Sequence, residues 1–210
     1  MMRRSTVGRW MACGLAFSVL GWNAGCDTPK DKSGDWFEGG AEMPPNEETL
    51  RMTARILASK GEFAKAGYTV DRMIVEHPLR EASYTEGAEI LLQQGRVVDA
   101  ILLLDLGLDR LPGNPILLND RGLCRLLEAD LSGATLDFAA ALEADPRDAD
   151  YVANMALVLA LSGDEKASRK LWSRVLPADE VESNLELARA ARGRFVRAAE
   201  EPLNDVELDG

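Results

Sequence analysis

The chain has 210 residues, of which 46% are hydrophobic and 28% are charged, the ordinary balance of a globular protein with one or two domains. It holds 35 acidic and 24 basic residues and shows no basic stripe after residue 26, so no nucleic-acid partner is expected. We interpret the arginines between residues 189 and 197 as a solvated helix face. Without residues 1–25, which include three arginines and no acid, the net charge would change from −11 to −14.

Residues 1–25 have the order of an export signal. A basic start precedes an apolar run of 13 residues, from Trp10 to Trp22, and small residues follow it. This run is too short to cross a membrane, because a spanning helix needs roughly 20 apolar residues. We therefore predict a cleaved signal peptide at residues 1–25 and an exported mature chain.

The letters NAGCDT at residues 23–28 resemble a bacterial lipobox, in which small residues precede a cysteine that is lipidated and becomes the new N-terminus. Ala24, Gly25 and Cys26 fit this pattern, whereas Asn23 replaces the usual aliphatic residue. The resemblance implies a lipid anchor on Cys26 and a membrane-anchored lipoprotein that faces the periplasm. The alternative is that Cys26 is only a small residue near the cleavage site.

We predict that residues 26–46 comprise the anchor cysteine and a flexible tether. The segment after Cys26 is polar, rich in Gly and Pro, and lacks periodicity. Within it, Trp36 and Phe37 are expected to pack onto the domain that follows, and a partner contact is the alternative. The mature chain keeps one further cysteine, Cys124, and a domain of this size needs no disulfide. We therefore predict a buried, unreactive Cys124.

Prolines recur every 34 residues, and each one marks a place where a helix is expected to stop, because proline lacks a backbone donor and restricts the preceding residue. They are Pro44, Pro78, Pro112 and Pro146. The chain accordingly divides into four rows without insertions, and each row is predicted to form a helix, a short turn and a second helix. The rows are 47–80, 81–114, 115–148 and 149–182.

Similar residues align in the columns of these rows. A small residue that lets helices approach closely is found at Ala54, Ala88, Gly122 and Ala156. A residue suited to a tight turn is found at Gly61, Gly95, Ala129 and Gly163, and glycine tolerates the positive φ of such turns. A third column is again small, at Ala66, Ala100, Ala134 and Ser168. Four residues later, on the same helix face, lie the bulky side chains of Val70, Leu104, Phe138 and Trp172.

These columns resemble the tetratricopeptide repeat (TPR), and GATLDFAAALEADP and ALVLALSGD carry the likeness best. The resemblance implies an all-α TPR solenoid of four helix pairs, whose core forms only when neighbouring pairs stack. Arg125 departs from the family pattern, because the other rows have leucine in that column. The fourth row closes early, at Pro177, so a shortened second helix is expected there.

Local signals mark helix starts. Asn114 before Pro115 is expected to cap a helix that has proline in its first position. Ser183 and Glu186 have the spacing of a capping box, which predicts a capping helix at residues 183–199 that seals the last repeat and faces water. The acidic residues 200–210 are predicted to form a disordered tail.

The sequence offers little material for catalysis, which needs a nucleophile, a base and a charge-stabilising group to converge. His77 is the only histidine, and its place before Pro78 predicts a turn or capping role. One histidine and one cysteine within the rows do not make a zinc site, and DLSGATLD lacks the lysine of a phosphate loop. We therefore predict that the protein is not an enzyme and uses no cofactor, no metal and no small-molecule substrate.

The TPR resemblance implies that the first helices line a concave protein-binding groove. We expect Arg51 and Arg55 to charge its first half. Asn119 and Asn154 are expected to hold a peptide backbone. The apolar second half is expected to contain Leu123, Leu127, Leu157 and Leu161. A partner peptide or helix could lie there, unless these leucines pack between helices instead. The basic clamp with which some TPR domains hold a C-terminal carboxylate is absent, because Glu86, Glu89, Ile116 and Asp120 occupy comparable positions.

Two segments, YVANMALVLALSGDEKA and ESNLELARAARG, together with the anchor signal and the small number of repeats, resemble the TPR lipoproteins that assemble pili, especially those of the tight-adherence (Tad) system. This resemblance implies a non-catalytic scaffold in the bacterial envelope that assists assembly of a pilus or secretion machine. The alternative is a periplasmic, chaperone-like adaptor for envelope proteins or for an enzyme complex.

Overall fold

The computed structural model describes the backbone of residues 45–200 and the side chains of residues 45–193. The predicted signal peptide, Cys26, most of the predicted tether with Trp36 and Phe37, and the tail after residue 200 lie outside the described residues. Between residues 45 and 200 the protein consists of nine α-helices and has no strand, which confirms the all-α prediction.

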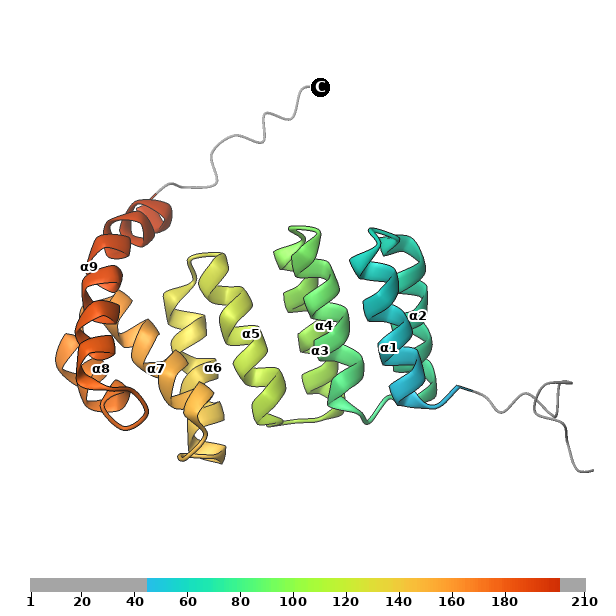
Figure 1. The fold of residues 1–210 in the computed structure, drawn as a ribbon, viewed down its shortest axis with the longest axis horizontal. Coiled ribbons are helices and arrows are strands. Elements are labelled where there is room, and N and C mark those ends of the chain that lie inside the picture. Colours follow the sequence, from blue (N-terminus) through green and yellow to red (C-terminus); the bar gives the residue numbers. More distant parts are fainter. Residues whose placement is uncertain (1–44, 201–210) are drawn as a thin grey trace, which may run out of the picture. The chain divides into compact units, whose positions relative to one another are not determined.

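The helices form pairs that repeat every 34 residues. The first helices of the pairs are α1 (Glu47–Ser59), α3 (Glu81–Gln93), α5 (Pro115–Leu127) and α7 (Ala149–Ser162). The second helices are α2 (Phe63–Glu76), α4 (Val97–Arg110), α6 (Leu131–Ala144) and α8 (Glu165–Trp172). A ninth helix, α9 (Ala178–Glu200), follows the fourth pair. The pairs lie side by side in chain order, and each first helix contacts the next one, with α9 contacting α7 (Figure 1).

The core lies between the two helices of each pair and between neighbouring pairs, where the small and bulky columns meet. All eight residues of the two columns that begin at Ala66 and Val70 are buried. Helices α5 and α6 pack closely, because a Cβ atom added at Gly122 would lie 2.6 Å from Cε1 of Phe138. Only glycine therefore fits at this position without movement of the ring.

The predicted turn column is confirmed. Gly61, Gly95 and Gly163 have φ values of 74°, 72° and 99°, and Ala129 has a φ of 60°. Because positive φ costs free energy for a residue with a Cβ atom, Ala129 is a locally strained position that the packing of α5 against α6 must hold.

Two helix starts differ in how well local signals predicted them. The Asn114 side chain accepts hydrogen bonds from the N–H groups of Ile116 and Leu117, which confirms the predicted cap of α5. The predicted capping box at Ser183 is wrong, because α9 begins at Ala178 and Ser183 lies within this helix. The first turn of α9 forms directly after proline, where the carbonyl of Pro177 accepts a hydrogen bond from the N–H of Val181.

The early start of α9 alters the end of the fourth row. The second helix of that row, α8, has 8 residues, whereas α2, α4 and α6 each have 14, so the predicted shortening is confirmed. The last residues of the predicted row 149–182 belong to α9. The capping helix therefore spans Ala178–Glu200 rather than residues 183–199, and it includes the first residue of the predicted tail.

Arg125, the residue that departs from the repeat pattern, belongs to a charged cluster between α5 and α6. Its Nη1 lies 2.8 Å from Oδ2 of Asp137, a carboxylate that is almost fully buried. Arg121 also binds Asp137, at 2.6 Å, and reaches Asp105 of α4 at the same distance. These carboxylates raise the pKa of Arg121 further, so the guanidinium stays charged. The buried acid thus explains why an arginine occupies a column that is elsewhere apolar.

Two arginines hold α9 against the fourth pair. Arg189 lies 2.6 Å from Glu165 at the start of α8, and Arg192 donates a hydrogen bond of 2.8 Å to the carbonyl of Ala160 in α7. The Arg189 guanidinium lowers the pKa of Glu165 to about 2. Arg189 is nevertheless 47% exposed, in agreement with the predicted solvated face, whereas Arg192 is half-buried and departs from it. Within residues 45–200, no helix combines the length and the apolar character needed to cross a membrane.

Candidate protein-binding groove

Three hollows follow one another along the face that the first helices form. One lies between α1 and α3, the next between α3 and α5, and the third among α5, α7, α8 and α9. Glu89 lines the first two hollows, and consecutive stretches of α5 line the second and third. We call this row of three hollows the groove.

The two arginines predicted for the groove have acidic partners, and Arg55 lines the first hollow, whereas Arg51 lines none of the three. Arg51 lies 2.7 Å from Glu48, and Nε of Arg55 lies 2.7 Å from Glu86 of the next pair. Glu86 is 2% exposed, and burial raises its pKa, while the bond from Arg55 opposes that rise. Arg55 thus compensates a buried acid within the protein, although its own side chain is 54% exposed.

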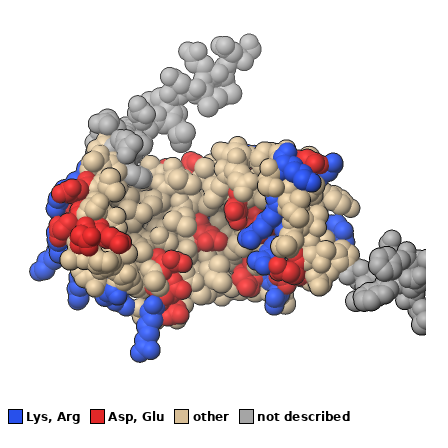
Figure 2. Space-filling model, in the orientation of Figure 1, with Lys and Arg blue, Asp and Glu red and all other residues tan. Residues whose placement is uncertain are grey.

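The middle of the groove is acidic. Thr85, Glu89 and Leu92 of α3 and Asp120 and Leu123 of α5 line a hollow of about 240 Å³. Figure 2 shows acidic atoms in this part of the face, between α3 and α5. Asp120 is half-buried and takes part in none of the ion pairs among the described side chains.

The surroundings of Asp120 shift its acidity. Burial raises the pKa of Asp120 to about 6, and the nearby Glu89 adds to the rise, whereas a hydrogen bond with Asn119 opposes it. The Asp120 carboxylate is therefore ionised at neutral pH. Its charge lowers the stability of the folded protein, because no basic side chain of the described residues compensates it.

The two predicted asparagines contact each other. Oδ1 of Asn119 accepts a hydrogen bond of 2.8 Å from Nδ2 of Asn154, which joins α5 to α7 across neighbouring repeats. Asn119 is buried and Asn154 is half-buried. The prediction that both hold a peptide backbone therefore applies only to their remaining polar atoms, because one acceptor and one donor bind within the protein.

The third hollow is apolar and has a volume of about 630 Å³. Leu127 of α5 and Leu187 of α9 stand at its rim and are 66% and 65% exposed. Leu157 of α7 lines the hollow but is half-buried and packs against the core. Leu161 also lines the hollow, as predicted, but it is only 4% exposed and belongs to that core.

The contribution of α9 to this hollow was not predicted from the sequence. Asn184, Leu187, Ala188 and Ala191 all line it, together with Trp172 of α8. Their spacing of three and four residues is that of one helix face. The apolar periodicity of α9 could have indicated this wall, but the prediction assigned that face only to sealing the last repeat.

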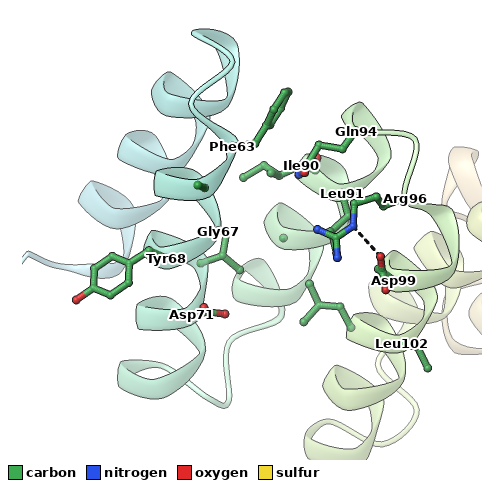
Figure 3. A pocket seen from close by; sticks show the side chains of 14 residues that line it. Phe63, Gly67, Tyr68, Asp71, Ile90, Leu91, Gln94, Arg96, Asp99 and Leu102 are labelled. Carbon is green, nitrogen blue, oxygen red and sulfur yellow. Dashed lines mark hydrogen bonds and ion pairs between the residues drawn. The ribbon is translucent and has the colours of Figure 1, made fainter.

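A further hollow, of about 720 Å³, lies on the other side of the first two pairs, among α2, α3 and α4. Its rim carries the ion pair between Arg96 and Asp99, and Leu102 of α4 lies beside them (Figure 3). Tyr68 of α2 points away from α4 in the same view. This hollow shares no lining residue with the third hollow of the groove.

The described side chains include one cysteine, Cys124, and one histidine, His77. Cys124 is buried, as predicted, and burial raises the pKa of its thiol to about 11, so it remains protonated at neutral pH. His77 lies at the C-terminal end of α2, in agreement with the predicted turn position. Between residues 45 and 193, no group of three potential metal-binding side chains is present.

Asp120→Asn is expected to stabilise the protein at pH 7.5 but not at pH 4. The folded state holds the Asp120 proton more tightly than the unfolded state, because the pKa rises from 3.8 to about 6 on folding. The free energy of unfolding of the wild type therefore falls by about 1 to 3 kcal/mol as the pH rises from about 4 to about 6, and it stays at the lower value above pH 6. Asparagine has no proton to lose, so the variant avoids this loss. Urea unfolding at several pH values measures the effect. Asp99→Asn, on an exposed pair, is the control, and an Asp120→Asn effect of equal size at both pH values would contradict the prediction.

Comparison with known proteins identifies the fold. No family model and no curated protein matches the chain. Among solved structures, a TPR protein from Parabacteroides merdae has 18% identity and a TM-score of 0.58, over 77% of this chain and 68% of that one. TTC0263, a TPR protein of Thermus thermophilus, has 17% identity and a TM-score of 0.56, over 76% and 84% of the two chains.

YrrB, described as a TPR protein with an unusual peptide-binding site, has 16% identity and a TM-score of 0.54, over 74% of this chain and 82% of that one. At such identities the likeness shows the fold alone. The described part of the chain is therefore an all-α TPR solenoid of four helix pairs with a C-terminal helix, as the repeat predicted.

Proposed function

We propose that this protein is a non-catalytic scaffold that binds a peptide segment or helix of another protein in the groove. The hollow among α5, α7, α8 and α9 carries the proposal, because two leucines stand exposed at the rim of an apolar depression large enough for several side chains. Bulky apolar anchors of an amphipathic helix or an extended segment fit such a depression. The peptide-binding site that the description of YrrB names supports the same use of this fold.

Leu127→Glu and Leu187→Glu test the proposal. Each change places a charge at the rim of the apolar hollow, so we expect partner binding to fall at least about tenfold, while the thermal unfolding temperature stays near that of the wild type. Pull-down from envelope extracts with quantitative mass spectrometry measures binding, and circular dichroism measures unfolding.

Leu102→Glu is the matched control, since Leu102 is 60% exposed and lies at the hollow on the other side of the molecule. It is expected to leave binding unchanged. Loss of binding in Leu102→Glu, with normal binding in both groove variants, would assign the partner to the hollow among α2, α3 and α4 and would contradict the proposal.

We also propose that the chain is exported and attached to a bacterial membrane by a lipid on Cys26, where it assists assembly of a pilus or secretion machine. The signal-like residues 1–25 and the lipobox resemblance support the location. The resemblance of residues 151–167 and 182–193 to Tad pilus-assembly lipoproteins supports the role.

Cys26→Ser is expected to release the protein from the membrane into the soluble periplasmic fraction, because the lipid acceptor is lost and the repeats are untouched. Cell fractionation with immunoblotting measures the distribution. Cys124→Ala serves as the control and should stay with the membrane. Retention of Cys26→Ser at the wild-type level would contradict lipidation and indicate an uncleaved signal.

A further inference from the structure

We propose that the segment bound in the groove carries a lysine or arginine next to bulky apolar side chains, and that Asp120 binds this basic group. The inference rests on the proposed function and specifies the chemistry of the partner. It follows from three features of the groove, namely its balance of charge, the surroundings of Asp120 and the order of side chains along α5.

The groove has an excess of acid. Glu86 and Glu89 line the first hollow together with Arg55 and lie 2.7 Å and 3.8 Å from it. Arg55, the one arginine that lines the three hollows, is thus paired with carboxylates. Asp120 remains as a third acid without a basic partner among the described side chains, so the free charge of the groove is negative. An acidic surface selects a basic partner and repels an acidic one.

No positive group faces Asp120 from the helices packed around it. Glu89 of α3 and Tyr151 of α7 are close enough to interact with its charge, as is Cys124 on α5 itself. Arg121, the next residue in the chain, is directed toward α4 and α6, where it binds Asp105 and Asp137. A cation from a partner would therefore be the first positive charge to compensate this half-buried carboxylate.

Apolar side chains continue the same helix face. Asp120, Leu123 and Leu127 are three and four residues apart on α5 and therefore lie on one side of that helix. Leu123 shares the hollow of Asp120, and Leu127 stands at the rim of the apolar hollow. A segment with its basic group at Asp120 would consequently place neighbouring apolar side chains over the two leucines.

Selection from a phage-displayed library of random dodecapeptides tests the inference, with the purified protein as bait. Three baits are compared, namely the wild type, Asp120→Lys, and Asp99→Lys as a control on the other face. Peptides selected by the wild type and by Asp99→Lys should be enriched in lysine or arginine beside leucine, phenylalanine or tryptophan. Peptides selected by Asp120→Lys should lose the basic residue and gain an acidic one.

A selected peptide is then synthesised with its basic residue and with glutamine in that place. The glutamine peptide should bind the wild type about tenfold more weakly, and should bind Asp120→Asn as well as the original peptide does. Asp120→Asn also provides the comparison if circular dichroism shows that Asp120→Lys does not fold.

The outcomes separate the two proposals. Peptides that compete for the groove but show no basic preference, or the same preference with Asp120→Lys, would overturn this inference and leave the binding function in place. Selection of no peptide, or of peptides that still bind Leu127→Glu and Leu187→Glu normally, would overturn the proposed function and this inference with it.

Discussion

Phe138→Ala is expected to lower the free energy of unfolding by about 3 to 5 kcal/mol. The phenyl ring has no exposed surface and fills the space between α5 and α6, in the core cluster that also contains Trp172 and Leu185. Gly122 provides the opposite wall, where a Cβ atom would lie 2.6 Å from the ring. Because both helices are anchored by further repeats, the cavity left by alanine cannot close fully.

Urea-induced unfolding, followed by circular dichroism, measures this loss. Leu136→Ala is the matched control, since Leu136 lies on the same helix two residues earlier and is 72% exposed. It should change the free energy by less than about 0.5 kcal/mol. A loss under about 1 kcal/mol for Phe138→Ala would show that this column does not form the core.

Asp137→Ala is expected to cost about 3 kcal/mol. The change removes the almost fully buried carboxylate that binds Arg121 and Arg125, and it leaves both guanidinium groups beside an apolar site. We expect a loss of stability at the lower end of the range that is typical of broken buried ion pairs, because Arg121 keeps its ion pair with Asp105 and both arginines retain some exposed surface.

Asp99→Ala is the control for this prediction. It removes an ion pair with Arg96 at a similar distance of 2.7 Å, but both side chains are about half exposed, so the loss should stay below about 1 kcal/mol. Equal losses for Asp137→Ala and Asp99→Ala in urea unfolding would show that water, rather than Asp137, compensates the two arginines.

Much of the fold followed from local patterns. The turn column, the buried columns and the cap of α5 at Asn114 depend on backbone rules and on side chains three or four residues apart. The start of α9 could not be read in the same way. Ser183 and Glu186 satisfy the spacing of a capping box, but the helix already forms after Pro177, so both residues lie within the helix and not at its start.

The groove was predicted less completely than the fold. The repeat predicted that Leu123 and Leu127 share the face of the first helices, and both line hollows on that face, because equivalent positions of successive first helices share one side. It did not distinguish Leu161, which is buried, from Leu127, which is exposed. Leu187 was missed, since its role depends on where α9 lies against α7.

The sequence alone determined the period, the helix pairs, the turns and the small and bulky columns, because each repeat follows the same short-range rules of backbone and side-chain spacing. Only the tertiary structure decided which charges compensate one another. Arg55 binds Glu86, 31 residues away, and Arg121 binds two acids on different helices, while Asp120 binds no basic group of the described residues. Burial and the distances between packed helices set these pairings, and neither quantity is encoded in the spacing of residues along one helix.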